Sequence, residues 1–286
     1  MNTPSDRSGA SDGRHERGGA HPETEPVISL SSWTRTIRDH YSLTRPEAAD
    51  SIGISPHYLK DIENDGFVPR PEIIQSLITG YRLDPAQARL TWDLYQPPSI
   101  LPPASELRER IASARDDVLE QLDHTTMALA FLDPAWNILV ANNSFYRKLL
   151  PHTEFRPGAN VATWALPPAP SPSPAEPLLA QPAKEARWLV GVLRGGFARY
   201  RTSPEVIRLY RQLSLNKAFN HHWHNTIHVA HGRGVEQPLH LLDPTTGKPY
   251  IVGLQTTEII DMPEIRGFLI WRPQHSGRLT PPLTQM

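Results

Sequence analysis

Four histidines in the C-terminal half of the sequence have a spacing that suits metal chemistry. His221, His224, His228 and His231 follow one another at intervals of three, four and three residues, which places them on one face of a predicted helix. A histidine pair four residues apart can ligate Zn²⁺, and a zinc enzyme adds a third ligand and a carboxylate base. No glutamate stands inside this repeat. A metal site, a polar face that responds to pH or contacts a ligand, and a solvated helix surface therefore stay open as interpretations.

Other residue patterns typical of enzymes are missing. The sequence has no cysteine, no Gly-x-Ser-x-Gly and no glycine-rich phosphate loop. The lack of cysteine also excludes a disulfide framework and favours a reducing compartment. No apolar run approaches the roughly 20 residues that a membrane-spanning helix needs. We therefore expect a cytoplasmic protein without membrane contact that is not an enzyme, with no catalytic residue, no metal ligand and no cofactor.

A short stretch near the N-terminus predicts two helices joined by a tight turn. Thr44 and Glu47 form a capping box that opens the first helix, with a proline in its first turn. Gly53 supplies the positive φ that a tight turn requires. Ser55 and Pro56 then cap and start the second helix only a few residues later. This arrangement indicates a helix-turn-helix.

The second of these helices has one buried side and one exposed end. Leu59 and Ile62 fall on the same side and anchor the helix in its domain. His57, Tyr58 and Lys60 lie near the N-terminal end. In a recognition helix that end enters the major groove of DNA.

The register of these residues resembles the bacterial xenobiotic-response-element (XRE) helix-turn-helix family. The resemblance covers about residues 30–95 and is carried by Leu43 to Ala49, Gly53 to Ser55, Leu59, Ile62 to Glu63, Gly66 and Pro71. It implies that Arg45 contacts phosphate and that the exposed end of the second helix contacts bases or backbone. The candidate DNA-binding residues are Arg45, Ser55, His57, Tyr58, Lys60 and Arg70. Acidic residues outnumber basic ones five to three between Thr44 and Arg70, so we expect weak binding by one subunit and reliance on a homodimer.

The C-terminal half predicts strands, then helices, then strands, which is an α+β pattern. A helix over residues 105–123 carries an apolar stripe, and turn residues at 133–137 separate two short strands. The predicted strands are residues 127–132, 138–141, 250–260 and 267–271, and the later helices are residues 183–200, a helix that starts at Pro204, and residues 217–231. A loop rich in proline, residues 167–182, is expected on the surface.

Aromatic side chains recur through this half and are suited to the walls of an apolar ligand pocket. For each of them, packing in an ordinary core is the alternative. The candidate ligand-binding residues are Phe131, Asn142, Phe145, Tyr146, Trp164, Trp188, Phe197, Tyr210, Phe219 and Trp223.

Part of this half resembles the opening of a PAS-type sensory domain, through Met127 to Asp133, Trp136 to Asn142, and Phe145 with Tyr146. Together with the preceding domain, the sequence is similar to the MmyB-like transcription regulators. Leu193-Arg194, Phe219 with Trp223, and the turn at Thr246-Gly247 add to the resemblance. It implies a domain that binds a fatty-acyl or other apolar small molecule.

A chain of 286 residues is longer than a single core usually supports, so two domains are expected. The predicted organisation is a disordered tail (1–27), an all-α helix-turn-helix domain (28–95), a proline-rich linker (96–104), an α+β PAS-like domain (105–273) and a flexible tail (274–286). These features predict a homodimeric regulator in which a bound ligand reorients two DNA-binding domains. The alternatives are a degenerate helix-turn-helix that binds protein, and a metal enzyme that uses the histidines.

Overall fold

The computed structural model describes residues 26–64, 67–124, 127–149, 158–234, 236–243, 245–259 and 261–271. The tails expected at 1–27 and 274–286 lie outside these ranges except for residues 26 and 27. Within these ranges, no helix is long and apolar enough to cross a membrane.

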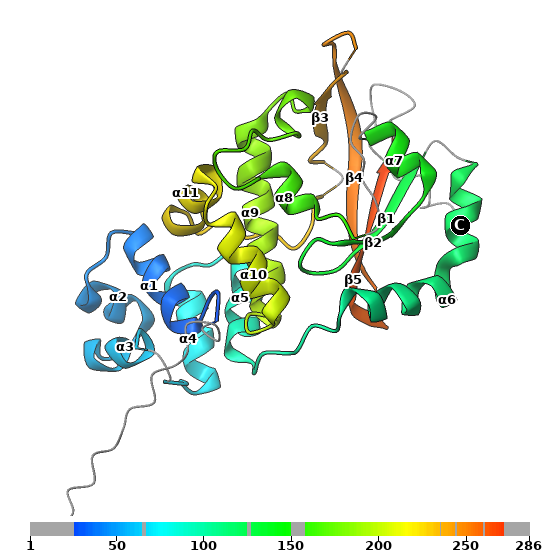
Figure 1. Cartoon of the computed structure of the whole chain (residues 1–286). Helices are drawn as coiled ribbons and strands as arrows, with labels where there is room; N and C mark the ends of the chain where they lie inside the picture. Colours follow the sequence, from blue (N-terminus) through cyan, green and yellow to red (C-terminus); the bar gives the residue numbers. More distant parts are fainter. Residues whose placement is uncertain are drawn as a thin grey trace, which may run out of the picture.

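The chain has a helical N-terminal part and a C-terminal part with one sheet (Figure 1). The N-terminal helices are α1 (Leu30–His40), α2 (Arg45–Ile52), α3 (Pro56–Ile62), α4 (Pro71–Gly80) and α5 (Pro85–Tyr95). The later helices are α6 (Ala104–Asp123), α7 (Asn143–Leu149), α8 (Val161–Ala165), the 3-10 turn η1 (Glu176–Leu178), α9 (Pro182–Arg199), α10 (Pro204–Leu213) and α11 (Lys217–Asn225). The strands are β1 (Ala128–Leu132), β2 (Ile138–Ala141), β3 (Leu239–Leu242), β4 (Pro249–Ile259) and β5 (Met262–Trp271).

The capping residues and the turn glycine around α2 and α3 have the roles that the sequence predicts. The Thr44 side chain accepts from the Glu47 backbone N–H, and the Glu47 carboxylate accepts from the Thr44 backbone in return. Gly53 ends α2 in the left-handed conformation, with φ of 78°. The Ser55 hydroxyl then caps α3, and Leu59 is fully buried beneath it. The two predicted helices and their turn are therefore confirmed as elements.

A buried carboxylate ties α3 to its neighbours. Glu63 has no exposed surface, and its carboxylate accepts from Arg38 Nε at 2.5 Å and from Arg45 Nε at 2.7 Å. Burial raises the pKa of Glu63, but the hydrogen bonds from these two guanidinium groups outweigh it and lower the pKa below its usual value. The sequence counts Glu63 among the acidic residues of a DNA-facing surface, whereas the structure places it inside the domain.

The C-terminal part contains a five-stranded antiparallel sheet with strand order β2-β1-β5-β4-β3. The hairpin expected between β1 and β2 is present, and the Asp133 carboxylate closes it by accepting from the backbone and side chain of Asn137. The α+β class of this half is thereby confirmed, while its PAS-like character stays a prediction.

The helix predicted over residues 217–231 is too long, because α11 ends at Asn225 and Thr226 is extended, with φ of −133° and ψ of 152°. Arg194 causes this early end. Its guanidinium donates to the carbonyls of His222, Trp223 and His228, so these oxygens are satisfied without a further helical turn.

The chain beyond α11 runs along α9 where that helix has glycines. The Ala230 N–H donates to the Gly191 carbonyl at 3.1 Å. A Cβ at Gly191 would lie 2.6 Å from the His228 ring, and one at Gly195 would lie 2.6 Å from the Ala230 carbonyl oxygen. This close approach therefore requires glycine at both positions.

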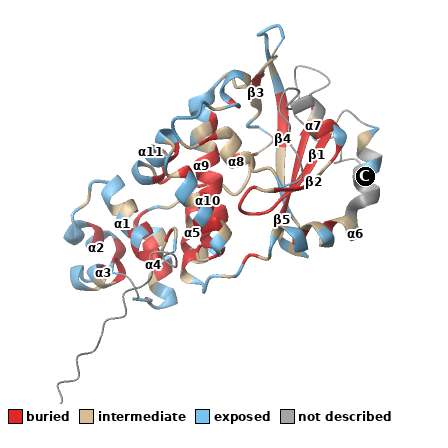
Figure 2. Cartoon of the chain, in the orientation of Figure 1, coloured by how far each residue is buried: buried red, intermediate tan, exposed pale blue. Residues whose placement is uncertain are grey.

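The N-terminal helices pack directly against the C-terminal part, and buried residues of both belong to one core (Figure 2). Arg201, which follows α9, donates to the carbonyls of Leu94 and Gln96 at the end of α5. The segment expected as a linker between α5 and α6 is also packed, since Leu101 is 3% exposed and its N–H donates to Ser203 Oγ.

We expect Arg194→Met to destabilise the fold strongly. Arg194 is 1% exposed, and its removal leaves the buried Trp223 carbonyl without this donor and weakens the contacts to His222 and His228. The loss of unfolding free energy should be about 2–4 kcal/mol by urea titration. Arg187→Met, at an exposed position of the same helix, is the control. Equal unfolding midpoints for the two variants would contradict this role of Arg194.

Candidate functional site

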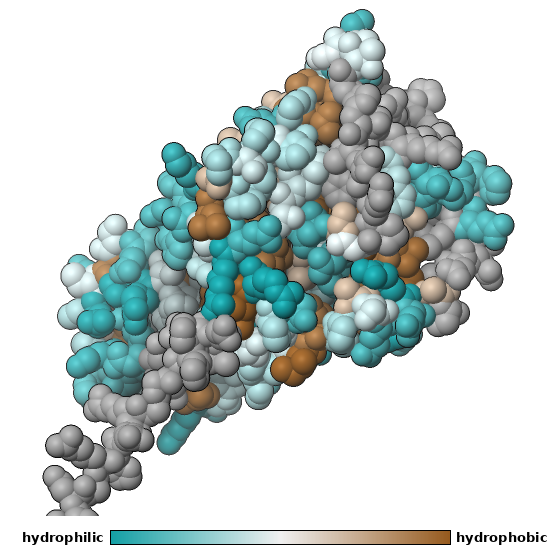
Figure 3. Space-filling model, in the orientation of Figure 1, coloured by the Kyte–Doolittle hydropathy of each residue, from teal (hydrophilic) through white to brown (hydrophobic). Residues whose placement is uncertain are grey.

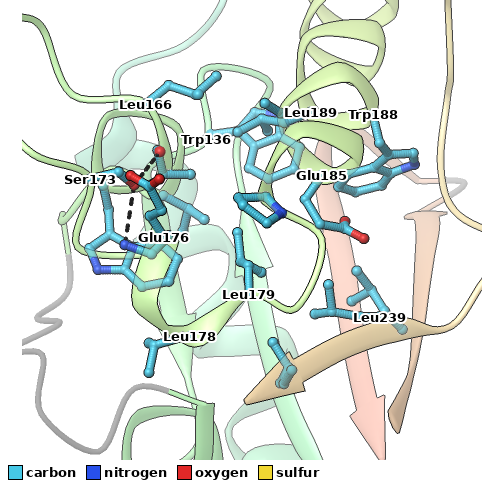
Figure 4. A pocket seen from close by; sticks show the side chains of 18 of the residues that line it. Trp136, Leu166, Ser173, Glu176, Leu178, Leu179, Glu185, Trp188, Leu189 and Leu239 are labelled. Carbon is cyan, nitrogen blue, oxygen red and sulfur yellow. Dashed lines mark hydrogen bonds between the residues drawn. The ribbon is translucent and has the colours of Figure 1, made fainter. Parts of the chain in front are cut away.

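A cavity of about 440 Å³ lies between α9, the proline-rich loop and the sheet (Figure 4). Its volume is within the range of small-molecule sites in proteins, and its lining is predominantly apolar. The main apolar lining residues are Leu166, Ala175, Leu178 and Leu179 from the loop, Ala186, Trp188 and Leu189 from α9, and Leu239, Leu254, Phe268 and Ile270 from the sheet. The arrangement can hold an apolar molecule.

Strand alternation and one unusual turn residue build the sheet side of the cavity. Phe268 and Ile270 are two residues apart on β5, so both point to the same face. Trp136 has φ of 64° in the β1–β2 turn. Its ring lies 5.2 Å from Phe268 and 6.1 Å from Trp188, measured between centroids. Trp136 thus joins the sheet to α9 at the cavity wall.

The proline-rich loop, predicted as a surface loop, forms a wall of this cavity. Ala175 has no exposed surface, and Leu179 forms a β-bridge with Leu241 of β3. The Ser173 hydroxyl donates to the Ala165 carbonyl at 2.6 Å, and the Asn216 side chain donates to a carbonyl of the loop. The loop is exposed at most of its positions, and it also supplies one wall of the cavity.

One end of the cavity carries a buried ion pair. Glu185 on α9 is 7% exposed and Arg233 is 6% exposed, and each oxygen of the carboxylate accepts from one terminal nitrogen of the guanidinium. The guanidinium also lies over the Trp188 ring, 4.2 Å from its centroid. Arg233 Nε has no hydrogen-bond partner among the described residues.

Three of the ten sequence-predicted ligand residues line the cavity, namely Phe145, Trp164 and Trp188. Phe131 and Tyr146 lie outside its lining, and Asn142 instead holds the backbone together, since its Oδ1 accepts from the N–H groups of Leu129 and Phe145. The remaining four, Phe197, Tyr210, Phe219 and Trp223, form a second cluster of rings, and the Arg194 guanidinium lies over the ring of Trp223.

Several cavity residues are absent from the sequence prediction. Phe268 and Ile270 could have been predicted, because they are two residues apart on a predicted strand and so point to the same face. Leu178 and Leu179 had a weaker one, as an apolar pair inside a loop that is otherwise rich in proline. Arg233 had none, since nothing local distinguishes it from a surface arginine.

The predicted DNA-binding residues lie at the start of α2, at and within α3, and just before α4, in the part of the molecule far from the sheet (Figure 1). The His57 side chain is 82% exposed, and Lys60 is exposed as well. The Tyr58 ring contacts Phe67 edge-on at 5.4 Å. Arg70 is exposed before α4, and the Ser55 hydroxyl is occupied by the cap of α3.

Arg45 differs from the other members of this set. Its Nε pairs with the buried Glu63, although 45% of the side chain stays exposed. The first contribution of Arg45 is therefore to hold α2 and α3 together.

The four spaced histidines do not share a helix face. His221 and His224 are exposed on α11, whereas His228 and His231 lie beyond its end against α9. Over the described ranges, no group of three or more metal-binding side chains comes together. The geometry on which the metal-enzyme alternative depends is therefore not formed there.

The segment from Thr226 to Gly234 links the cavity to α5. At one end Arg233 lines the cavity. Nearer the other end, the Ile227 carbonyl accepts from Gln87 Nε2 at 2.9 Å. Between them, His231 Nε2 lies 3.1 Å from the Ala86 carbonyl oxygen. One short segment thus contacts both the cavity and the last N-terminal helix.

Comparison with known families identifies the domain that contains this cavity. Residues 112–249 match a model described as the MmyB-like transcription regulator ligand binding domain. The match runs from within α6 to the first residue of β4 and includes the proline-rich loop, α9 and Arg233. This part of the chain is therefore a ligand-binding domain of the MmyB-like type. No curated protein matches the chain.

We expect acid to destabilise the folded protein at His231, because the charged ring is costly to bury there. Burial lowers the pKa of His231 to about 4, nearby Arg89 and Arg266 act in the same direction, and the Ala86 carbonyl and Glu258 oppose them. The pKa of His231 in the folded protein lies below the ordinary value of 6.5. The stability that the neutral, buried ring contributes is therefore complete above about pH 6.5 and is lost as the pH falls toward about 4.

The test compares urea midpoints of the wild type and His231→Gln across that pH window. The glutamine does not titrate, so the variant should lose less stability than the wild type as the pH falls. Carboxylates that titrate in the same window affect both proteins equally. Parallel pH profiles would contradict the assignment to His231.

Proposed function

We propose that the protein is a ligand-responsive, sequence-specific DNA-binding transcription regulator whose C-terminal domain senses a small apolar molecule. The observation that carries the proposal is the apolar cavity, most of whose lining residues lie in the part of the chain that matches the ligand-binding domain family. The partners in this proposal are double-stranded DNA, the ligand and a second copy of the chain. The cavity has the shape and chemistry to bind, and the N-terminal helices supply the part that reads DNA.

Three features support the DNA-binding part of the proposal. The helices α2 and α3 are joined by a tight turn at Gly53, and the N-terminal end of α3 is exposed. The coloured surface over the N-terminal helices is largely hydrophilic in Figure 3. In addition, the exposed Arg35 of α1 donates to the Glu63 backbone carbonyl, which places a basic group from outside the sequence of α2 and α3 beside α3. A major groove is the natural partner for such an end.

The segment from Thr226 to Gly234 offers a route from ligand to DNA. A ligand at the polar end of the cavity contacts Arg233, and the same segment is hydrogen-bonded to α5 through Ile227 and His231. A ligand that prefers one position of this segment therefore biases the position of α5. In a homodimer, that bias changes the spacing of the two α3 helices and hence the affinity for an operator with two half-sites.

Lys60→Ala should weaken DNA binding by removing one exposed charge of α3. Operators selected from random duplexes would first supply the probe. On that probe, the variant should bind about tenfold more weakly per subunit. The slope of log affinity against log salt concentration should also be shallower by about one. Lys217→Ala, on the distant α11, is the control. Selection that enriches no duplex even at low ionic strength would contradict DNA reading and favour a helical module that binds protein.

Gln87→Glu should uncouple the ligand from DNA. The glutamate keeps the oxygen that accepts from the Asp84 N–H in the α5 cap, but it loses the donor to the Ile227 carbonyl. Affinity for an apolar ligand should stay within about twofold, while the change in operator affinity on ligand binding falls severalfold. Arg89→Ala breaks an exposed pair with Glu258 at the same junction and should change little. An undiminished response in Gln87→Glu would contradict this route.

A further inference from the structure

The buried ion pair at the end of the cavity limits which polar group can enter with an apolar ligand. Glu185 and Arg233 together carry no net charge, and both are more than nine-tenths buried. The rest of the lining offers little that can solvate an ion, and its other charged residue, Glu176, is exposed and acidic. The site is therefore polar at one end but already neutral.

A charged head group would upset this balance. A carboxylate that binds Arg233 must displace or share it with Glu185, which leaves a second negative charge in a desolvated place. An ammonium group leaves the corresponding excess of positive charge. Burial of an unpaired charge is far more costly than burial of a neutral group that makes its hydrogen bonds. The pair thus selects against both kinds of ion.

A neutral polar group meets the same site without that cost. Arg233 Nε has no hydrogen-bond partner in the described part of the chain, but it also has almost no accessible surface, so a ligand does not reach it. The Glu185 carboxylate keeps lone pairs beyond the contacts that it makes with Arg233. The matching group is neutral and donates a hydrogen bond to this carboxylate, as a hydroxyl or an amide does.

We infer that the cavity takes an apolar chain ending in a neutral group that donates a hydrogen bond, such as an amide or alcohol, in preference to a fatty-acid anion. This inference rests on the proposed ligand-binding function and narrows the ligand class. Glu185 is the residue that sets the preference, because it neutralises the guanidinium that a carboxylate would otherwise bind.

The test uses decanamide, 1-decanol and decanoate, which share a chain and differ in the polar end. Each is titrated into the full-length protein below its micelle concentration at neutral pH, with calorimetry and with the fluorescence of the tryptophans that line the cavity. The wild type should bind the amide about tenfold more tightly than decanoate. In Glu185→Gln, which frees Arg233, decanoate should gain about tenfold, so that it binds about as tightly as the amide. Glu109→Gln, exposed on α6 and outside the cavity lining, should leave the ratio within about threefold.

Decanoate that binds the wild type as tightly as decanamide does would overturn the inference. An unchanged ratio in a folded Glu185→Gln variant would overturn the role of the pair. The wild-type comparison decides the head group by itself if that variant fails to fold. Failure of all three probes to bind folded wild type would instead overturn the ligand-binding function, and the inference with it.

Discussion

The rest of the structure depends on the close packing of the chain after α11 against α9, at Gly191 and Gly195, which have no side chains. These glycines let the chain after α11 lie against α9 at a distance that no larger residue permits. From this position the carbonyls of His222, Trp223 and His228 converge on Arg194, and α11 stops where it does. The glycines therefore set both the end of a helix and the course of the segment that follows it.

That course gives the segment two sets of neighbours. Arg233 turns into the cavity beside Glu185, while Ile227 and His231 face α5. The helix α9 also contacts both regions. Residues near its start line the cavity, and Arg199 at its end and Arg201 just beyond it bind the chain after α5. Ligand site and N-terminal helices are thus joined by packed backbone rather than by a loose linker.

The sequence predicts those parts of the fold that short-range chemistry determines. Thr44, Gly53 and Ser55 act within one turn of their own position, so their patterns predict α2, the turn and α3 correctly. The end of α11 is different, because Phe219, Trp223 and Ile227 keep a helical period whether or not the helix continues. Its end depends on Arg194, about 30 residues earlier in the chain, and no local pattern contains that contact. The cavity is missed for the same reason, since its walls come from segments that meet only in the folded chain.

Buried charges explain why a count along the sequence describes the surface poorly. Glu63 is matched by Arg38 and Arg45, Glu185 is matched by Arg233, and Arg194 is matched by carbonyl dipoles. Each group lies inside because its partner removes the cost of burying it, so none of them acts as a free surface charge. Near α3, the partners of Glu63 include a residue of α1, which a count confined to α2 and α3 leaves out. In the cavity, the same matching turns two ionised side chains into a neutral polar end, and the chemistry of the ligand follows from the pair rather than from either charge alone.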